Sequence, residues 1–113
     1  MESDKVGKPS SARIRVAAPV SDRAEELTAR AQKLRRKGEL RRAAVMLREA
    51  CALDERNAAR WVALGDMLFR LGKKDEAAHA MKQSVFLRER AGEKPKANVV
   101  RRLILNLARK PRG

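Results

Sequence analysis

The sequence contains few of the side chains that enzymes use for chemistry. Its 113 residues include one cysteine, Cys51, one histidine, His79, and no tyrosine. One cysteine excludes an internal disulfide, and a lone histidine and cysteine are too few for a zinc site or for a nucleophile with its base. No glycine-rich phosphate loop is present either. We therefore expect no catalytic residue, no metal site and no cofactor, and we interpret Cys51 as a small buried apolar residue.

Long apolar runs are missing as well. No stretch approaches the roughly 20 consecutive apolar residues that span a bilayer. Charged residues stand near the N-terminus, where a secretory signal would have its apolar segment. These absences predict no membrane span and a cytoplasmic location. β-branched runs are scarce, whereas Ala, Arg, Leu, Glu and Lys are frequent, which favours an all-α fold.

Acidic residues are half as numerous as basic ones. The chain has 14 Asp and Glu against 28 Lys and Arg, a net charge of +14 at pH 7. A net positive charge of this size creates an electrostatic field that attracts polyanions. One hypothesis is therefore that the protein binds nucleic acid or an anionic membrane through a basic surface. Codon usage in the host is another explanation of the arginine content. With two Phe and one Trp, sequence-selective single-strand binding is disfavoured. The candidate residues for this hypothesis are Arg101, Arg102, Arg109, Lys110 and Arg112.

Apolar residues recur at helical spacing through the middle of the chain. Residues 58–71 place apolar side chains three and four positions apart, which predicts one apolar face of a helix. Gly72 ends that helix, because glycine adopts the left-handed conformation that closes a helix. A second helical pattern follows directly. The same arrangement occurs 34 residues earlier, where Gly38 takes the place of Gly72. Arg30 stands where the later period has Leu64, and we expect its charge to face solvent.

The later period carries a recognisable signature. Its residues are Trp61, Leu64, Gly65, Leu68, Gly72, Ala77 and Met81. Their spacing resembles the tetratricopeptide repeat, whose pattern is W-x2-L-G-x2-Y followed by A-x3-F. Leu68 replaces the usual Tyr, and Glu89 replaces the closing Pro. The resemblance implies a right-handed α-solenoid with two helix-turn-helix repeats, at residues 24–57 and 58–91. It also implies a non-catalytic adaptor that binds other proteins.

In that family a concave groove is lined mainly by the first helix of each repeat. Carried over by position, the groove residues are Thr28, Gln32, Arg35, Arg36, Val62, Asp66, Phe69 and Arg70. Val62 and Phe69 lie seven residues apart and share a helix face, with arginines near the same end. We expect a peptide with an apolar anchor and nearby Asp or Glu. The alternative is that Phe69 belongs to the core and the arginines form a solvated face. The asparagines of the family's carboxylate clamp are not matched.

Two segments flank the repeats. The composition of residues 1–20 predicts a disordered arm. Within it, residues 12–16 alternate between polar and apolar side chains and could add a strand to the edge of a partner's sheet. After a polar loop that begins at Gly92, we expect Asn98 to cap a basic amphipathic helix over about residues 98–110. This helix is predicted to pack across the second repeat as a cap. The alternative is that its apolar stripe covers a second copy of the protein.

Overall fold

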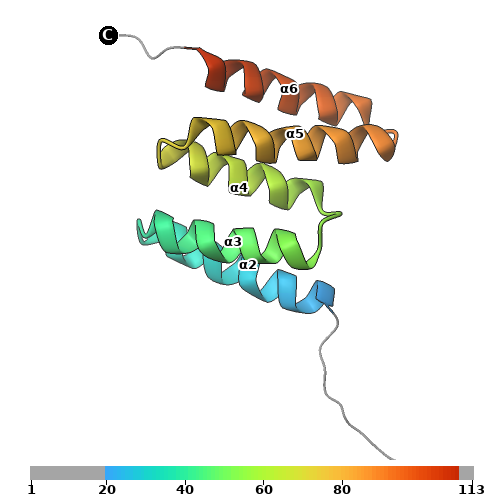
Figure 1. Ribbon diagram of the computed structural model, residues 1–113. Coiled ribbons are helices and arrows are strands. Elements are labelled where there is room, and N and C mark those ends of the chain that lie inside the picture. Colours follow the sequence, from blue (N-terminus) through green and yellow to red (C-terminus); the bar gives the residue numbers. More distant parts are fainter. Residues whose placement is uncertain (1–19, 110–113) are drawn as a thin grey trace, which may run out of the picture.

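The structure, a computed structural model, describes residues 20–109 of the chain. The predicted arm, apart from Val20, lies outside the described residues, as do Lys110 and Arg112. The described part is all-helical: α2 (Val20–Arg36), α3 (Leu40–Leu53), α4 (Ala58–Arg70), α5 (Lys74–Arg90) and α6 (Lys94–Ala108). The helices stack in sequence order, each antiparallel to the next (Figure 1). The predicted all-α solenoid is confirmed.

Three of the connecting turns are built alike. Gly38, Gly72 and Gly92 follow α2, α4 and α5, with positive φ angles of 83°, 82° and 76°. After each glycine, the next amide donates back to a carbonyl in the last turn of the preceding helix, as from Glu39 N to Leu34 O at 2.9 Å. Such bonds satisfy carbonyls that the helix end leaves free. The equal geometry brings each following helix back along the one before it.

The second hairpin is held together by a close crossing of α4 and α5. Gly65 lies against Met81 and Ala77, and a Cβ added at Gly65 would stand 2.7 Å from Met81 Cγ and 3.1 Å from the Ala77 carbonyl oxygen. Ala77 itself is fully buried. Leu64 and Leu68 fill the core beside this crossing and are 3% and 2% exposed. The small residues of the repeat signature are therefore required by the distance between the two helices.

The first hairpin repeats this arrangement with alanines. Ala31 of α2 and Ala43 of α3 are fully buried, and Leu47 lies between the hairpins in the shared core. A smaller cluster, formed by Ala24, Leu27, Ala50 and Leu53, joins the start of α2 to the end of α3. Arg30 is exposed and faces Glu26 at 3.8 Å, as expected for a charge on the outer surface of the first repeat.

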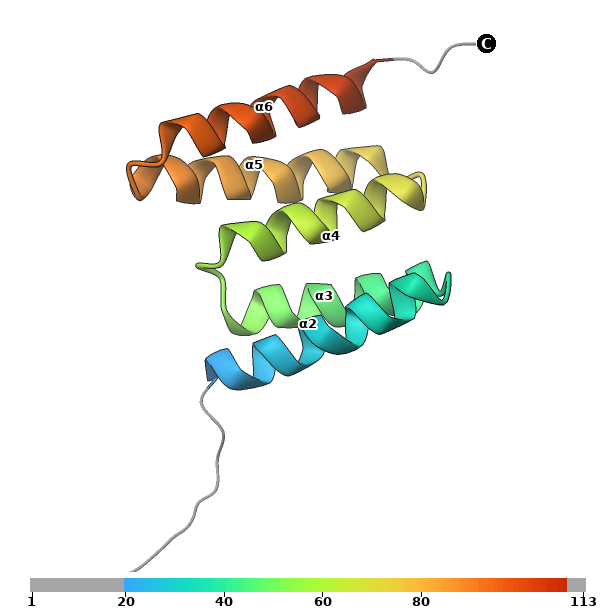
Figure 2. The same cartoon turned by 180° about the vertical axis from the view of Figure 1, so that it is seen from behind.

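The last helix begins earlier than the sequence analysis predicted. α6 starts at Lys94, so Asn98 lies inside the helix and is not its cap. Pro95, which falls between Gly92 and Asn98 where a loop is expected, occupies the first turn of α6, where a helix needs no N–H from that residue. The helix also ends at Ala108, before Lys110. It packs along α5 and adds Ala97, Val100 and Leu107 to the main core (Figure 2).

Candidate functional site: a groove across three parallel helices

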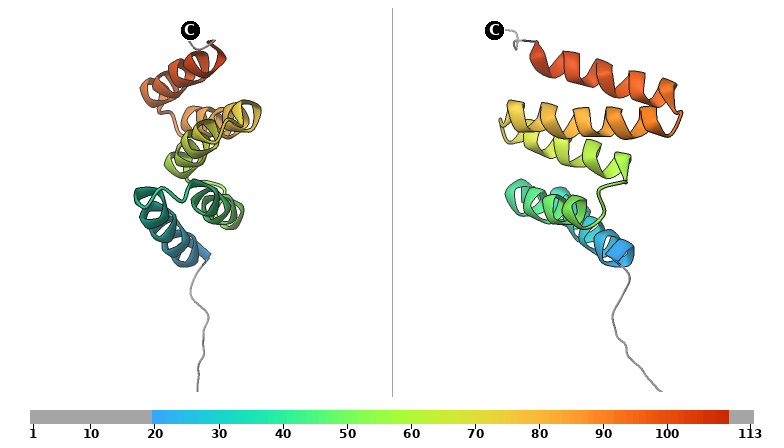
Figure 3. Two further views of the ribbon diagram at one scale, coloured as in Figure 1. Left: turned by 90° about the vertical axis from the view of Figure 1, so that its left-hand side faces the viewer. Right: turned by 45° about the vertical axis from the view of Figure 1, so that its right-hand side comes forward.

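A groove runs across one face of the solenoid, where α2, α4 and α6 lie parallel. These helices alternate with α3 and α5 in the stack, as the two views of Figure 3 show. The groove has a volume of about 500 Å³. Its lining residues come from all three helices and from Met81 of α5: Gln32, Arg35, Ala59, Val62, Ala63, Asp66, Met67, Phe69, Met81, Leu103, Asn106 and Leu107.

Two large apolar side chains stand open to solvent in this groove. Phe69 near the end of α4 is 39% exposed, and Leu103 of α6 is 36% exposed. Val62, about two turns earlier on the same face of α4, is half-buried and also lines the groove. Exposed apolar side chains grouped in a concave surface are typical of binding sites for partner segments. Within residues 20–109, Phe69 is not part of the buried core; it lines the groove and is partly open to solvent.

Polar groups surround the apolar part of the groove. Arg35, half-buried at the last turn of α2, forms no ion pair with any residue in the range 20–109. Asp66 instead accepts a hydrogen bond from Arg70 Nε at 3.1 Å. Gln32 and Asn106 add amide groups from α2 and α6. Because Asp66 is already paired, Arg35 is the charged side chain of the groove that is free to meet a carboxylate.

The structure brings together most of the predicted groove residues. Gln32, Arg35, Val62, Asp66 and Phe69 line the groove. Thr28 lies in a neighbouring hollow between α2 and α4, which Gln32 also lines. Arg36 and Arg70 are exposed at the ends of their helices and do not line the groove.

The contribution of α6 to the groove was not predicted from the sequence. Leu103, Asn106 and Leu107 complete the groove, although no repeat signature occurs in their part of the chain. The available signal was the glycine turn at Gly92, which matches those at Gly38 and Gly72 and predicts that α6 returns as the first helix of a further repeat.

Solved structures share this arrangement of helices. The second TPR domain of Spaghetti (RPAP3), bound to an HSP90 peptide, has a TM-score of 0.58 at 19% identity, covering 77% of this chain and 94% of that domain. The Yersinia enterocolitica type III secretion chaperone SycD, in complex with a peptide of the translocator YopD, has a TM-score of 0.58 at 20% identity, covering 87% of this chain and 84% of that one.

This protein has the tetratricopeptide repeat fold. No protein-family model and no curated protein sequence matches the chain. The likeness therefore establishes the fold, and the groove of this tetratricopeptide domain is described from its own residues.

A buried arginine holds two of the groove helices in place. Arg60 of α4 is 6% exposed. Its Nε donates to the Thr28 hydroxyl of α2 at 2.7 Å, and its Nη1 lies 3.3 Å from Asp54 in the turn before α4. The Thr28 hydroxyl in turn donates to the Ala24 carbonyl at 2.7 Å. Thr28 thus supports the tetratricopeptide groove by positioning α2 against α4.

Three of the five basic residues proposed as a polyanion site lie within residues 20–109, at different places along α6 and its end. Arg101 bonds to Glu89 and to Asn98, near the α5–α6 turn. Arg109 follows the last residue of α6, at the other end of the helix. Arg102 is exposed between them. Lys110 and Arg112 lie outside the described residues.

The remaining candidate groups lie outside the groove. Cys51 is 1% exposed, and burial raises the pKa of its thiol to about 11, opposed by the charge of Arg60 and reinforced by that of Asp54. His79 is exposed on α5. Within residues 20–109 no group of three or more His, Cys, Asp or Glu could hold a metal ion. None of the helices in that range is long and apolar enough to cross a membrane.

Proposed function

We propose that this protein is a non-catalytic interaction module that binds a segment of a partner protein in the groove between α2, α4 and α6. The observation that carries the proposal is the pair of exposed apolar side chains, Phe69 and Leu103, that line a groove of about 500 Å³. The peptides held by the RPAP3 domain and by SycD, which share the fold, support it. An apolar anchor in a preformed groove is a common mode of peptide recognition.

The preferred segment has an apolar anchor residue with a carboxylate beside it. The anchor buries its side chain against Phe69, Val62 and Leu103, which removes apolar surface from water. Arg35 stands beside this apolar part and pairs with the carboxylate, since a guanidinium binds both carboxylate oxygens at once. Gln32 and Asn106 are placed to bond the backbone of an extended segment.

A phage-displayed library of random peptides tests this proposal directly. Peptides selected on the wild-type protein are expected to share an apolar residue next to Asp or Glu. Phe69→Ala should weaken the binding of a selected peptide about tenfold or more, because the anchor loses its main contact. Phe86→Ala is the matched control, since Phe86 is 50% exposed on α5 under the guanidinium of Arg90 and does not line the groove.

Arg35→Gln separates the charge from the apolar contact. It should weaken peptides that carry the carboxylate and leave those without it unchanged. Equal binding by wild type, Phe69→Ala and Phe86→Ala would show that the groove is not the binding surface.

A further inference from the structure

The topology gathers positive charge at one edge of the solenoid. Because successive helices are antiparallel, the α2–α3 turn, the α4–α5 turn and the end of α6 lie at the same edge (Figure 1). The basic residues at this edge, here called the basic edge, are Lys33, Arg36, Lys37, Arg41, Arg42, Arg70, Lys73, Lys74 and Arg109. All nine are exposed. The acidic residues of the same turns and helix ends are four, Glu39, Asp66, Asp75 and Glu76, so positive charge dominates.

The α2–α3 turn supplies the densest part of this charge. Residues 33–42 contain six basic side chains and one acidic one, Glu39. Glu39 pairs with Arg42, whose Nη1 is 2.7 Å from the carboxylate. Within residues 20–109, no ion pair is formed by Arg36, Lys37 or Arg41. Their charges are therefore available to a ligand.

A hollow lies next to this turn, between α3 and the α4–α5 turn. It has a volume of about 450 Å³, and its charged lining residues are Arg41, Arg48 and Lys73. Glu76 lies 2.8 Å from Arg48 and 3.8 Å from Lys73, and the hydrogen bond from Arg48 holds the pKa of Glu76 below its usual range. Glu76 thus pairs with two of the three cations and leaves Arg41 without an ion pair within residues 20–109, so the hollow keeps an excess of positive charge in a concave place where a phosphate fits.

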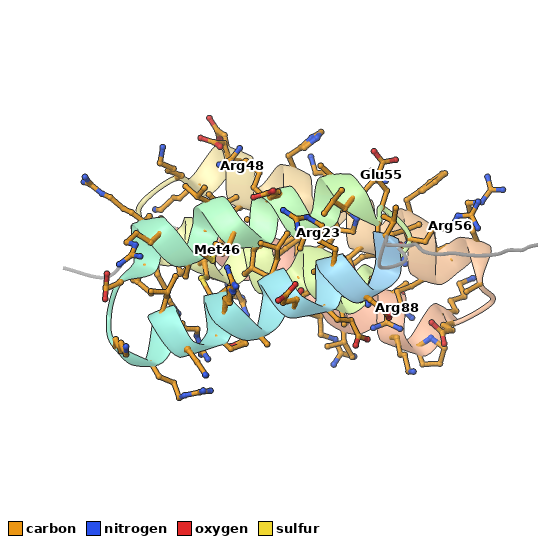
Figure 4. All side chains as sticks on the ribbon, turned by 90° about the horizontal axis from the view of Figure 1, so that it is seen from below. Arg23, Met46, Arg48, Glu55, Arg56 and Arg88 are labelled. Atoms are coloured by element: carbon orange, nitrogen blue, oxygen red, sulfur yellow. The ribbon has the colours of Figure 1, made fainter. Side chains whose placement is uncertain are left out.

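The opposite edge differs, because acidic partners take up many of its cations. Arg88 lies 2.9 Å from Glu93, and Lys96 lies 3.6 Å from the same carboxylate. Arg101 pairs with Glu89. Figure 4, viewed from below, shows Arg56 and Arg88 at this opposite edge, away from the α2–α3 turn. The excess of positive charge is therefore local to the basic edge.

We propose that the basic edge binds the sugar–phosphate backbone of nucleic acid. Its cations extend over two turns and the end of α6, which suits a long polyanion with regularly spaced charges. Arginines predominate in the α2–α3 turn and can grip phosphate oxygens in pairs. The single large apolar side chain in residues 36–42 is the half-buried Leu40, so this turn lacks the apolar groups that insert into a membrane surface. Because no aromatic ring lies among these residues, contact is with phosphates and independent of sequence.

Binding of a short fluorescein-labelled RNA of mixed sequence, measured by anisotropy at several salt concentrations, tests the proposal. The edge variant combines Arg36→Gln, Lys37→Gln and Arg41→Gln. The control variant combines Arg23→Gln, Arg56→Gln and Lys94→Gln, which removes the same charge from exposed positions away from the basic edge. Circular dichroism melting confirms that both variants fold.

The edge variant is expected to bind the RNA about tenfold more weakly, with the control within about twofold of wild type. The slope of log affinity against log salt should become shallower by about 2 in the edge variant, since each lost phosphate contact on a single strand accounts for about 0.7. Phe69→Ala should bind RNA as wild type does, so that failure here is distinguishable from failure of the peptide groove.

Three results would overturn the proposal. Equal weakening in the edge and control variants would mean that the net charge, and not the basic edge, attracts RNA. Displacement of the RNA by polyglutamate at equal charge would show an acidic polypeptide to be as good a ligand. Binding to phosphatidylserine vesicles that depends on the same three residues, with no RNA binding, would assign the edge to a membrane.

Discussion

The second hairpin meets its two neighbours in different ways. At its junction with the first hairpin, the buried guanidinium of Arg60 links Thr28 and Asp54 in the midst of an otherwise apolar contact. At its junction with α6, the contact is formed by Ala97, Val100 and Leu107, and ion pairs such as Arg88–Glu93 lie at the rim. One junction therefore has a directional polar centre, and the other has an apolar centre with a polar border.

This difference separates orientation from stability. Burying Arg60 removes it from water, and its bonds to Thr28 and Asp54 repay much of that desolvation without a large net gain. They do, however, require one relative placement of α2 and α4, the two helices that contribute all of the predicted groove residues. The junction with α6 stabilises mainly through apolar burial, which is non-directional. The polar junction shapes the groove, and the apolar junction secures the end of the stack.

Removing α6 altogether should have the largest effect. A chain that ends at Gly92 loses Ala97, Val100 and Leu107 from the core they share with Met81 and Val85. We expect loss of the cooperative unfolding transition and binding of a hydrophobic dye, because two repeats expose too much apolar surface alone. Thermal melting followed by circular dichroism checks this. A soluble truncated chain with a sharp transition would show that α6 serves a ligand and not the stack.

Single leucine truncations compare the core beside the α4–α5 crossing with the junction to α6, with the helices intact. Leu64→Ala should lower the free energy of unfolding by about 2–5 kcal/mol, because Leu64 is 3% exposed and its removal leaves a cavity. Leu107→Ala should lower the free energy of unfolding by about 2 kcal/mol, the lower end of this range, because the last turn of α6 can relax into the space that the side chain leaves. Urea denaturation of both variants gives the values. An unchanged midpoint for Leu64→Ala would contradict the repeat register.

Two substitutions at Arg60 test the polar junction. Arg60→Ala should cost about 1–3 kcal/mol, because it leaves a cavity and deprives Asp54 and Thr28 of their partner. Arg60→Met keeps most of the volume and should cost less than about 1 kcal/mol, yet loosen the placement of α2 against α4. Urea denaturation gives the free energies, and binding of a selected peptide reports the groove. If Arg60→Met left peptide affinity unchanged, the arginine would have no positioning role.

A smaller, pH-dependent effect arises from Cys51 beside that junction. The pKa of its thiol is raised from 9.0 to about 11 in the folded protein. The folded state therefore keeps its proton while the unfolded state ionises, so this contribution is complete below about pH 9 and is lost as the pH rises toward 11. Near pH 10 the loss should be about 1 kcal/mol. The measurement is the free energy of unfolding of wild type and Cys51→Ala between about pH 9 and 11, where the variant should lose stability less steeply. If the two curves of free energy against pH were parallel, Cys51 would make no such contribution.

Much of the fold follows from local rules in the sequence. The glycines that end α2 and α4 are visible in the sequence, and the need for a small residue at Gly65 follows from the family signature. Pro95 misled the prediction of α6, because a proline fits both a loop and the first turn of a helix. The turn at Gly92, which precedes α6, was the better indicator of where this helix begins.

The candidate site was less predictable, because it depends on which helices become parallel neighbours. The helical spacing of Val62 and Phe69 places both in the groove, whereas the sequence places Leu103 beside them only if the turn at Gly92 is taken as the start of a further repeat. Arg60 was missed for a similar reason: its partners Thr28 and Asp54 come together only when the hairpins pack. The basic edge arises in the same way from turns that are distant in sequence.

The order of packing has a consequence for folding kinetics. The helices pack chiefly on their neighbours in sequence, from α2 to α6. Chains with such local contacts have low contact order and fold quickly, and their repeats can nucleate at more than one place. Fraying of α2 would then leave the α4–α5 crossing at Gly65 intact, so that opening of the stack proceeds from an end inward.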